Sequence, residues 1–282
     1  MEAMANLSNL ELTNIFGLGL RSPHYSYLET RPQTQVGWFE IISENYFRTH
    51  GRPRKVLESL RLDYPISCHG VSLSIASYDD FDWKYLQDLK NFYDEIDPFI
   101  ISDHLCFTGV KNNNLHNLLP FAYNHENLKH ISSRIDQIQN FFGRKFGFEN
   151  LSAYFDYKNS TMNEWEFIQE LLEITDCNLL LDLNNLFVNS YNHSFDPDFF
   201  LDSIPLERVQ EIHLAGFSQR DGFYFDTHST SLYPELISLY KKVLNKRKNI
   251  PVVYEWDENI PEFNILEKQI IDIQNIWKEH PI

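Results

Sequence analysis

Short apolar runs recur along the chain, and the stretches between them carry helical patterns. Such short runs are typical of parallel strands that helices cover. They predict strands at residues 15–21, 36–42, 64–73, 98–107, 145–151, 177–185, 209–216 and 251–257. Apolar residues spaced three and four positions apart predict helices, most clearly at 83–96, 128–142 and 232–243. The connection at 21–36 is short and contains proline, so we expect no full helix there.

Eight strands that alternate with helices favour an α/β fold of the (β/α)8 TIM-barrel type. The alternative is an open, doubly wound sheet. Against it, GLGLRSPH at 17–24 resembles a G-x-G-x-x-G turn only superficially. No low-complexity linker divides the 282 residues, so we expect one domain over 1–282 with a short N-terminal extension at 1–14.

Composition and charge narrow the possible functions. A hydrophobic content of 43% is ample for a sizeable core, and the net charge of −16 argues against a general nucleic-acid binder. Three cysteines make no disulfide framework, which favours a reducing compartment. The first residues carry no basic segment followed by an apolar run, and no apolar run approaches the ~20 residues of a membrane span. We therefore expect a cytoplasmic protein that binds neither nucleic acid nor membrane.

Polar residues collect where six of the predicted strands end. Strands three to eight each bring one histidine or carboxylate: His69, His104, Glu149, Asp182, His213 and Glu255. Asp226 and His228 follow the seventh strand in the stretch FDTHS. The carboxyl ends of barrel strands converge on one rim, where the catalytic groups of this fold lie. We expect these eight side chains to lie together.

Several of these residues also have a structural interpretation. A single histidine near a strand end is more often a hydrogen-bonded structural residue than a ligand, and an aspartate there often caps the next helix. We expect Asp103 to be such a cap. Glu211 shares a face with His213 by alternation, and is either satisfied in the core or supports the site. Cys68 points away from His69, so we expect an inert, buried thiol.

The whole set favours metal ions. Four carboxylates and four histidines on one rim would repel one another and be poorly solvated unless cations paired with them. Mixed imidazole and carboxylate ligands suit iron, zinc or manganese better than calcium or magnesium. One metal is too few for so many ligands, so we expect two or three. Bridging carboxylates would hold neighbouring metals about 3.5–4 Å apart.

The chain also resembles the DUF692 family, the multinuclear non-haem iron-dependent oxidative enzymes. The matching stretches run in order from residue 17 to 257, and together they are specific although each alone is weak. They are GLGLRSPH (17–24), FEIISENYF (39–47), HGVSLS (69–74), SDHL (102–105), FENLS (148–152), LLLDLNNLFVNSYNHSFDP (179–197), IHLAG (212–216), DTH (226–228) and EWD (255–257).

The resemblance implies a xylose isomerase-like barrel and a division of the ligands among three metals. His69, His104 and Glu149 would hold the first metal. Glu149 would bridge to the second, which would also be held by Asp182, His213 and Glu255, and these six residues are the expected catalytic set. The third metal would be held by Asn185, Asp226 and His228, and more loosely, because an amide is a weak neutral ligand.

Four further residues are assigned to substrate binding. Asn184, which strand alternation places on the same face as Asp182, would orient ligands or substrate from behind the metals. His24, Glu44 and Asn45 lie near the rim ends of the first two strands and are assigned to substrate contact. For Glu44 and Asn45, a capping or loop network is an equally good interpretation.

The resemblance also implies a function. Members of the family oxidise side chains of ribosomally made peptides, often cysteine, with two or three iron ions in mixed Fe(II)/Fe(III) states and dioxygen as co-substrate. Many need a small partner protein that delivers the precursor peptide, so a heterodimer is expected. The alternatives are a zinc- or manganese-dependent hydrolase or sugar isomerase, and a metal-binding module without activity. Loops at 22–35 and 108–124 carry aromatic residues that either contact a peptide or pack on themselves.

Overall fold

Eight parallel strands close into a barrel in the computed structural model, which describes residues 15–111 and 113–280. The spatial order around the barrel is β1, β12, β9, β8, β7, β4, β3 and β2, and β2 pairs again with β1. The barrel strands are β1 (Phe16–Gly19), β2 (Trp38–Ile42), β3 (Ile66–Gly70), β4 (Ile100–His104), β7 (Gly147–Glu149), β8 (Asn178–Asp182), β9 (Val209–Leu214) and β12 (Val252–Tyr254).

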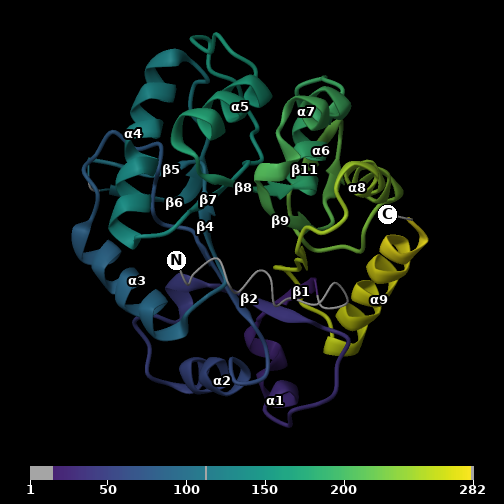
Figure 1. The fold of residues 1–282 in the computed structure, drawn as a ribbon. Coiled ribbons are helices and arrows are strands. Elements are labelled where there is room, and N and C mark those ends of the chain that lie inside the picture. Colours follow the sequence, from purple (N-terminus) through teal and green to yellow (C-terminus); the bar gives the residue numbers. More distant parts are fainter. Residues whose placement is uncertain (1–14, 112, 281–282) are drawn as a thin grey trace.

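Helices form an outer ring around these strands (Figure 1). They are α1 (Tyr25–Leu28), α2 (Arg52–Leu60), α3 (Trp83–Ile96), α4 (His125–Phe142), α5 (Glu164–Thr175), α6 (Leu183–Asn192), α7 (Pro197–Ser203), α8 (Pro234–Lys246) and α9 (Phe263–Glu279). Short 3-10 helices lie at Ser22–His24, Ser43–Asn45 and Leu206–Arg208. Two antiparallel hairpins project from the loops, β5 (Phe107–Val110) with β6 (Asn113–Leu119), and β10 (Ser218–Arg220) with β11 (Phe223–Phe225).

The helix α4 illustrates how the sequence builds this ring. Its apolar residues recur on one face, which is buried against the barrel. The Asn124 side chain accepts a hydrogen bond from the backbone N–H of Asn127 and so begins the helix. Gly143 ends it in the left-handed conformation, at φ 70°, which glycine adopts without strain.

The predicted barrel is confirmed, and the open sheet is wrong because β1 and β2 close the ring. The helices expected at 83–96, 128–142 and 232–243 are confirmed as α3, α4 and α8, and the connection at 21–36 holds only the four-residue α1. One prediction is wrong in detail, because the strand expected at 177–185 ends at Asp182, where α6 begins. The loop expected at 108–124 contains most of the hairpin formed by β5 and β6.

The expected N-terminal extension, 1–14, lies outside the described residues. Across residues 15–111 and 113–280, no helix combines the length and the apolar character needed to cross a membrane.

Gly17 makes a close approach that a larger residue would disrupt. A Cβ atom at this position would overlap the fully buried indole of Trp38, which also packs edge-to-face against Phe99 at a centroid distance of 5.0 Å. We expect Gly17→Ala to lower the free energy of unfolding by about 1–3 kcal/mol, because overpacking forces neighbours off their preferred positions. Urea unfolding would measure it.

The matched control is Gly51→Ala. Gly51 is exposed, and a Cβ atom there would meet its nearest neighbour at 3.7 Å. Its cost should stay below about 1 kcal/mol, since alanine only replaces glycine as a helix N-cap. Equal losses in the two variants would contradict the overlap with Trp38.

Candidate metal centre

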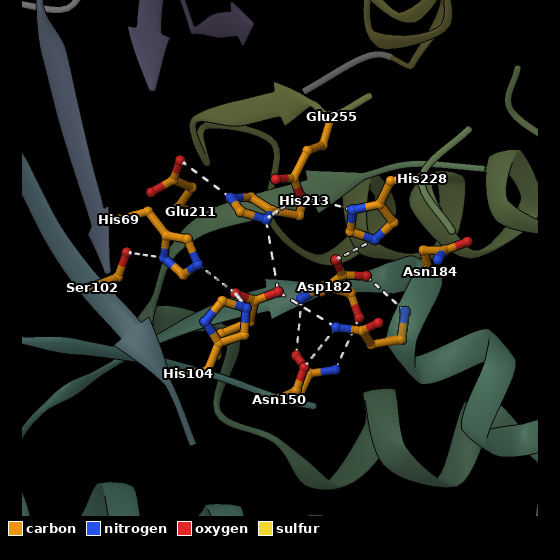
Figure 2. Close-up of polar contacts among 12 residues, drawn as sticks. His69, Ser102, His104, Asn150, Asp182, Asn184, Glu211, His213, His228 and Glu255 are labelled. Atoms are coloured by element: carbon orange, nitrogen blue, oxygen red, sulfur yellow. Dashed lines mark hydrogen bonds and ion pairs between the residues drawn. The ribbon is translucent and has the colours of Figure 1, made fainter. Parts of the chain in front are cut away.

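Strand register brings the key side chains together at the rim. Across β4 and β7 the Cα partner of His104 is Glu149, and across β8 and β9 the partner of Asp182 is His213. All four positions lie at or near the carboxyl ends of their strands, as predicted. Figure 2 shows His69, His104, His213 and His228 arranged around a common centre.

The first group consists of His69, His104 and Glu149, whose ligand atoms lie within 4.8 Å of one another. Oε2 of Glu149 lies 3.0 Å from Nε2 of His69 and 3.3 Å from Nε2 of His104. The other ring nitrogens are held from behind. Nδ1 of His69 is 2.9 Å from Oγ of Ser102, and Nδ1 of His104 is 3.1 Å from the carbonyl oxygen of Gly70. Both Nε2 atoms therefore face the same carboxylate.

The second group shares Glu149 with the first. Glu149, Asp182 and His213 also offer ligand atoms within 4.8 Å of one another. Nδ1 of His213 lies 3.7 Å from Oε1 of Glu149 and 3.1 Å from Oε2 of Glu255. The two oxygens of Glu149 thus face different histidines, which is the arrangement that a bridging carboxylate needs.

The third group differs from the expected set. Nε2 of His228 lies 2.5 Å from Oδ1 of Asp226, but Asp182 and Glu255 also come within reach of this histidine. Asn185 instead donates through Nδ2 to the carbonyl oxygen of Asn150 at 3.0 Å and to Oε1 of Glu149 at 3.4 Å. Its own Oδ1 is buried without a hydrogen bond.

The two carboxylate oxygens of Asp182 have different surroundings. One oxygen, Oδ1, accepts a hydrogen bond of 2.7 Å from the backbone N–H of Asn185 and so caps α6. The other, Oδ2, is buried and has no hydrogen bond. Asn150 fixes the backbone here, because its side chain bonds both the N–H and the carbonyl of Asp182, at 2.8 and 2.9 Å.

Buried atoms without a hydrogen bond converge on this centre. Among the described residues they include Glu149 Oε2, Asp182 Oδ2, Asn185 Oδ1, His213 Nδ1 and His228 Nε2. All of these are donor atoms that metals bind, and buried polar groups otherwise require partners. The residues present therefore fit metal ions.

The protonation state of His104 also favours a bound metal ion. Burial lowers the pKa of His104, so the ring is neutral and its one hydrogen is used at Nδ1 toward the Gly70 carbonyl. Its Nε2 lone pair then faces a Glu149 oxygen at 3.3 Å. Two electron-rich atoms at that distance repel unless a cation lies between them.

The other groups show how protons balance the charge. Burial alone would lower the pKa of His69, but the hydrogen bond and charge of Glu149 outweigh it and raise that pKa to about 9. Burial alone would raise the pKa of Glu149, but His104, His69 and His213 lower it to about 2. Burial raises the pKa of Asp182 well above its ordinary value. A bound cation would take over the role of these protons.

The residues assigned to substrate binding lie in different surroundings. Nδ2 of Asn184 donates to Oδ1 of Asp226 at 2.6 Å, but from the first turn of α6 and not by strand alternation. Nε2 of His24 contacts the carbonyl oxygen of Pro261 at 2.8 Å. Glu44 accepts from the backbone N–H of Val71 at 2.9 Å, and Asn45 is exposed. The contacts of His24 and Glu44 favour structural roles, and substrate contact stays a prediction.

Three structural interpretations are also decided by the contacts. Asp103 caps no helix; its Oδ2 accepts from the backbone N–H groups of Ser72 and Leu73 at 3.3 and 3.1 Å and shapes the loop after β3. Glu211 is fully buried, with Oε1 3.7 Å from Nε2 of His213. Cys68 is fully buried, and burial raises the pKa of its thiol, as expected for an inert residue.

Three charged neighbours of the centre were not predicted from the sequence: Arg21, Glu40 and Asp257. Arg21, at the end of β1, donates to Oε1 of Glu255 at 3.0 Å and also binds Asp257. Glu40 lies 3.1 Å from Nε2 of His213. The signal for Glu40 was present, because it is a lone charge inside the apolar run WFEII of β2.

The aromatic loop residues divide between core and surface. Tyr25 and Phe121 are buried, and Tyr123 packs against Phe167, so these three pack internally. Tyr27 is 43% exposed, although its ring contacts Phe263 at a centroid distance of 5.0 Å.

Comparison with known proteins places this chain in a family. Residues 15–278 match the model of a family described as RiPP precursor modification enzyme MbnB/TglH/ChrH, where RiPP denotes a ribosomally synthesised and post-translationally modified peptide. The chain belongs to this family. A UPF0276 protein of Acaryochloris marina is 42% identical over 250 residues, which cover 89% of this chain and 90% of that protein. One of Rhizorhabdus wittichii is 41% identical, covering 88% and 89%.

Crystal structures support the barrel assignment for this member of the MbnB/TglH/ChrH family. Endonuclease IV from Thermus thermophilus superposes with a TM-score of 0.62 at 15% identity, covering 94% of this chain and 99% of that chain. D-Psicose 3-epimerase from Clostridium cellulolyticum gives a TM-score of 0.62 at 9% identity, covering 94% and 98%. At such low identity these similarities show the fold alone, a xylose isomerase-like TIM barrel.

The shared carboxylate predicts unequal effects of two substitutions on metal content. Glu149→Ala removes a group that faces His69, His104 and His213, so we expect it to lower the metal bound per chain at two sites. His69→Ala should weaken one site only. Elemental analysis of both purified variants beside the wild type would measure this. Equal, mild losses in the two variants would contradict a bridging role for Glu149.

Metal affinity should also depend on pH. His69 carries a proton in the metal-free protein because its pKa is about 9, and a metal must displace that proton. Zinc affinity is therefore expected to rise with pH up to about pH 9, by up to about tenfold per pH unit for each displaced proton. Chelator-competition titrations from about pH 6 to pH 9 would measure this. An affinity that does not change over this range would contradict the protonated state of His69.

Proposed function

We propose that this protein is a multinuclear iron-dependent oxidative enzyme that modifies a precursor peptide, at cysteine, with dioxygen as co-substrate. The single observation that carries the proposal is the pair of ligand groups that share Glu149 within a buried rim of histidines and carboxylates. Membership in a family of RiPP precursor modification enzymes supplies the substrate class. Shared carboxylates favour neighbouring metals over isolated ones.

Each ligand has a role in the proposal. His69, His104 and Glu149 hold the first metal, and Glu149, Asp182, His213 and Glu255 hold the second. Asp226 and His228 hold the third, where the free Oδ1 of Asn185 is the remaining donor. When bound, iron supplies the one-electron chemistry with dioxygen that amino-acid side chains lack.

The chain's own residues prepare the site for that chemistry. Ser102, Gly70 and Asn150 hold two histidines and Asp182 from behind, which fixes the ligand atoms before a metal binds. Arg21 holds Glu255 and Asp257 in place by charge-assisted hydrogen bonds. Burial of the ligands excludes water, which strengthens their electrostatic interactions with a cation.

A peptide must reach this centre from the rim. The net charge of −16 favours a peptide or carrier with a neutral or basic face. We therefore include in the proposal a small partner protein that docks at the rim and presents the precursor peptide, with its cysteine thiolate directed at the metals.

The function is tested by reconstituting the metal-free protein with Fe(II) or with Zn(II) and adding a peptide encoded beside its gene, with and without the neighbouring partner. We expect a mass change on the peptide only with iron and dioxygen, and none when its cysteines are replaced by serine. Mass spectrometry of the peptide would measure this. Full turnover of a sugar or a phosphoester with zinc and without dioxygen would instead identify a hydrolase or isomerase and overturn the proposal.

A further inference from the structure

A pair of buried carboxyl groups lies beside the metal centre. Glu40 comes from β2 and Glu211 from β9, and their exposed fractions are 1% and 0%. Oγ of Ser67 lies between them, 3.4 Å from Oε2 of Glu40 and 3.3 Å from Oε2 of Glu211. Buried carboxylates cost free energy unless they are paired, so their partners must be accounted for.

His213 is the partner that Glu40 contacts. Its Nε2 lies 3.1 Å from Oε1 and 3.3 Å from Oε2 of Glu40, whereas the nearest Glu211 oxygen is 3.7 Å away. The other ring nitrogen, Nδ1, faces Glu255 at 3.1 Å and Glu149 at 3.7 Å. Glu40 and the metal-binding carboxylates therefore lie on opposite edges of one imidazole ring.

Both ring nitrogens of His213 lie 3.1 Å from a carboxylate oxygen, Nε2 from Glu40 and Nδ1 from Glu255. A carboxylate only accepts hydrogen bonds, so when Glu255 binds a metal, as proposed, the hydrogen of a neutral His213 belongs on Nε2, pointing at Glu40. Nδ1 is then left with its lone pair directed toward Glu149 and Glu255. Nδ1 is among the buried atoms that have no hydrogen bond.

We propose that Glu40 is a positioning residue that holds His213 so that Nδ1 binds the central metal. The inference rests on the proposed metal centre. Glu40, His213 and Glu255 also offer ligand atoms within 4.8 Å of one another. We assign Glu40 to the ring and not to the metal, because Glu40 faces Nε2 and the lone pairs of the two ring nitrogens diverge. Carboxylate–histidine–metal arrangements of this kind orient the ring and make it a stronger ligand.

The four histidines differ in the group that holds them from behind. His69 and His104 contact neutral acceptors, the Ser102 hydroxyl and the Gly70 carbonyl. Among these four, only His213 faces a buried carboxylate that is not assigned to a metal. Nδ1 of His228 lies 3.2 Å from Glu255, which is assigned to the second metal, and 3.1 Å from Asp257, whose side chain is 39% exposed. The central site is therefore the one whose affinity depends most on a charged neighbour.

The test is zinc binding by Glu40→Gln, measured by chelator competition without peptide or dioxygen. Glutamine keeps the shape but removes the charge, and its amide can turn a donor toward Nε2. We expect the affinity of the site that His213→Ala weakens to fall by about 10–100-fold, the range typical of such neighbours. Glu211→Gln is the matched control, buried in the same layer but beyond hydrogen-bond distance of Nε2, and should change affinity by less than about threefold.

A double-mutant cycle with His213→Ala separates positioning from direct binding. If Glu40 acts through His213, replacing Glu40 should cost little further affinity once the imidazole is gone. A full additional loss in that background, or unchanged affinity in Glu40→Gln, would overturn the inference. Zinc binding needs no peptide. The role of Glu40 can therefore be tested even if the proposed oxidation of a peptide fails.

Circular dichroism and thermal unfolding of each metal-free variant would verify its fold. Should Glu40→Gln not fold, Glu40→Asp replaces it, since it keeps the charge but withdraws the carboxylate from Nε2. We expect a loss of about tenfold or more there too. Wild-type affinity in Glu40→Asp would show that the hydrogen bond to His213 is not needed.

Discussion

The contact of Glu149 with three histidines is the constraint on which the rest of the site depends. One carboxylate that is almost fully buried faces His69 and His104 through Oε2 and His213 through Oε1. Such a group is tolerable only where positive charge is close, whether it comes from protons or from metals. The strand register of the barrel, the buried acceptors behind each ring and the cap on α6 all keep these atoms in place.

Much of this arrangement could be predicted from the chain alone. Short apolar runs have a simple physical cause, burial on both faces, and their ends mark the rim of a barrel. The six polar residues at strand ends could therefore be identified from the sequence, before any side-chain contact was known. The limits of an element were harder to predict, because a residue such as Asp182 suits both the last position of a strand and the cap of a helix. That ambiguity placed Asn184 on the wrong kind of element.

What could not be predicted is which buried groups contact one another across the barrel. Glu40 and His213 are 173 positions apart, and no local pattern relates them. Asp103 was expected to be a cap because its surroundings in sequence allow it, whereas its actual partners, the amides of Ser72 and Leu73, lie 31 and 30 positions away. Periodicity carries information about neighbours within one element, and closure of the barrel decides the rest.

The burial of the three cysteines has a consequence of its own. Cys68, Cys106 and Cys177 are all fully buried, and burial raises the pKa of each thiol above its ordinary value. Cys106 is close to His104 in the chain. Thiolates and not thiols react readily with oxidants, so sulfur atoms that stay protonated and enclosed are shielded from them. Under the proposed function, this burial keeps the protein's own three cysteines from competing with the cysteine of a peptide for the metal centre.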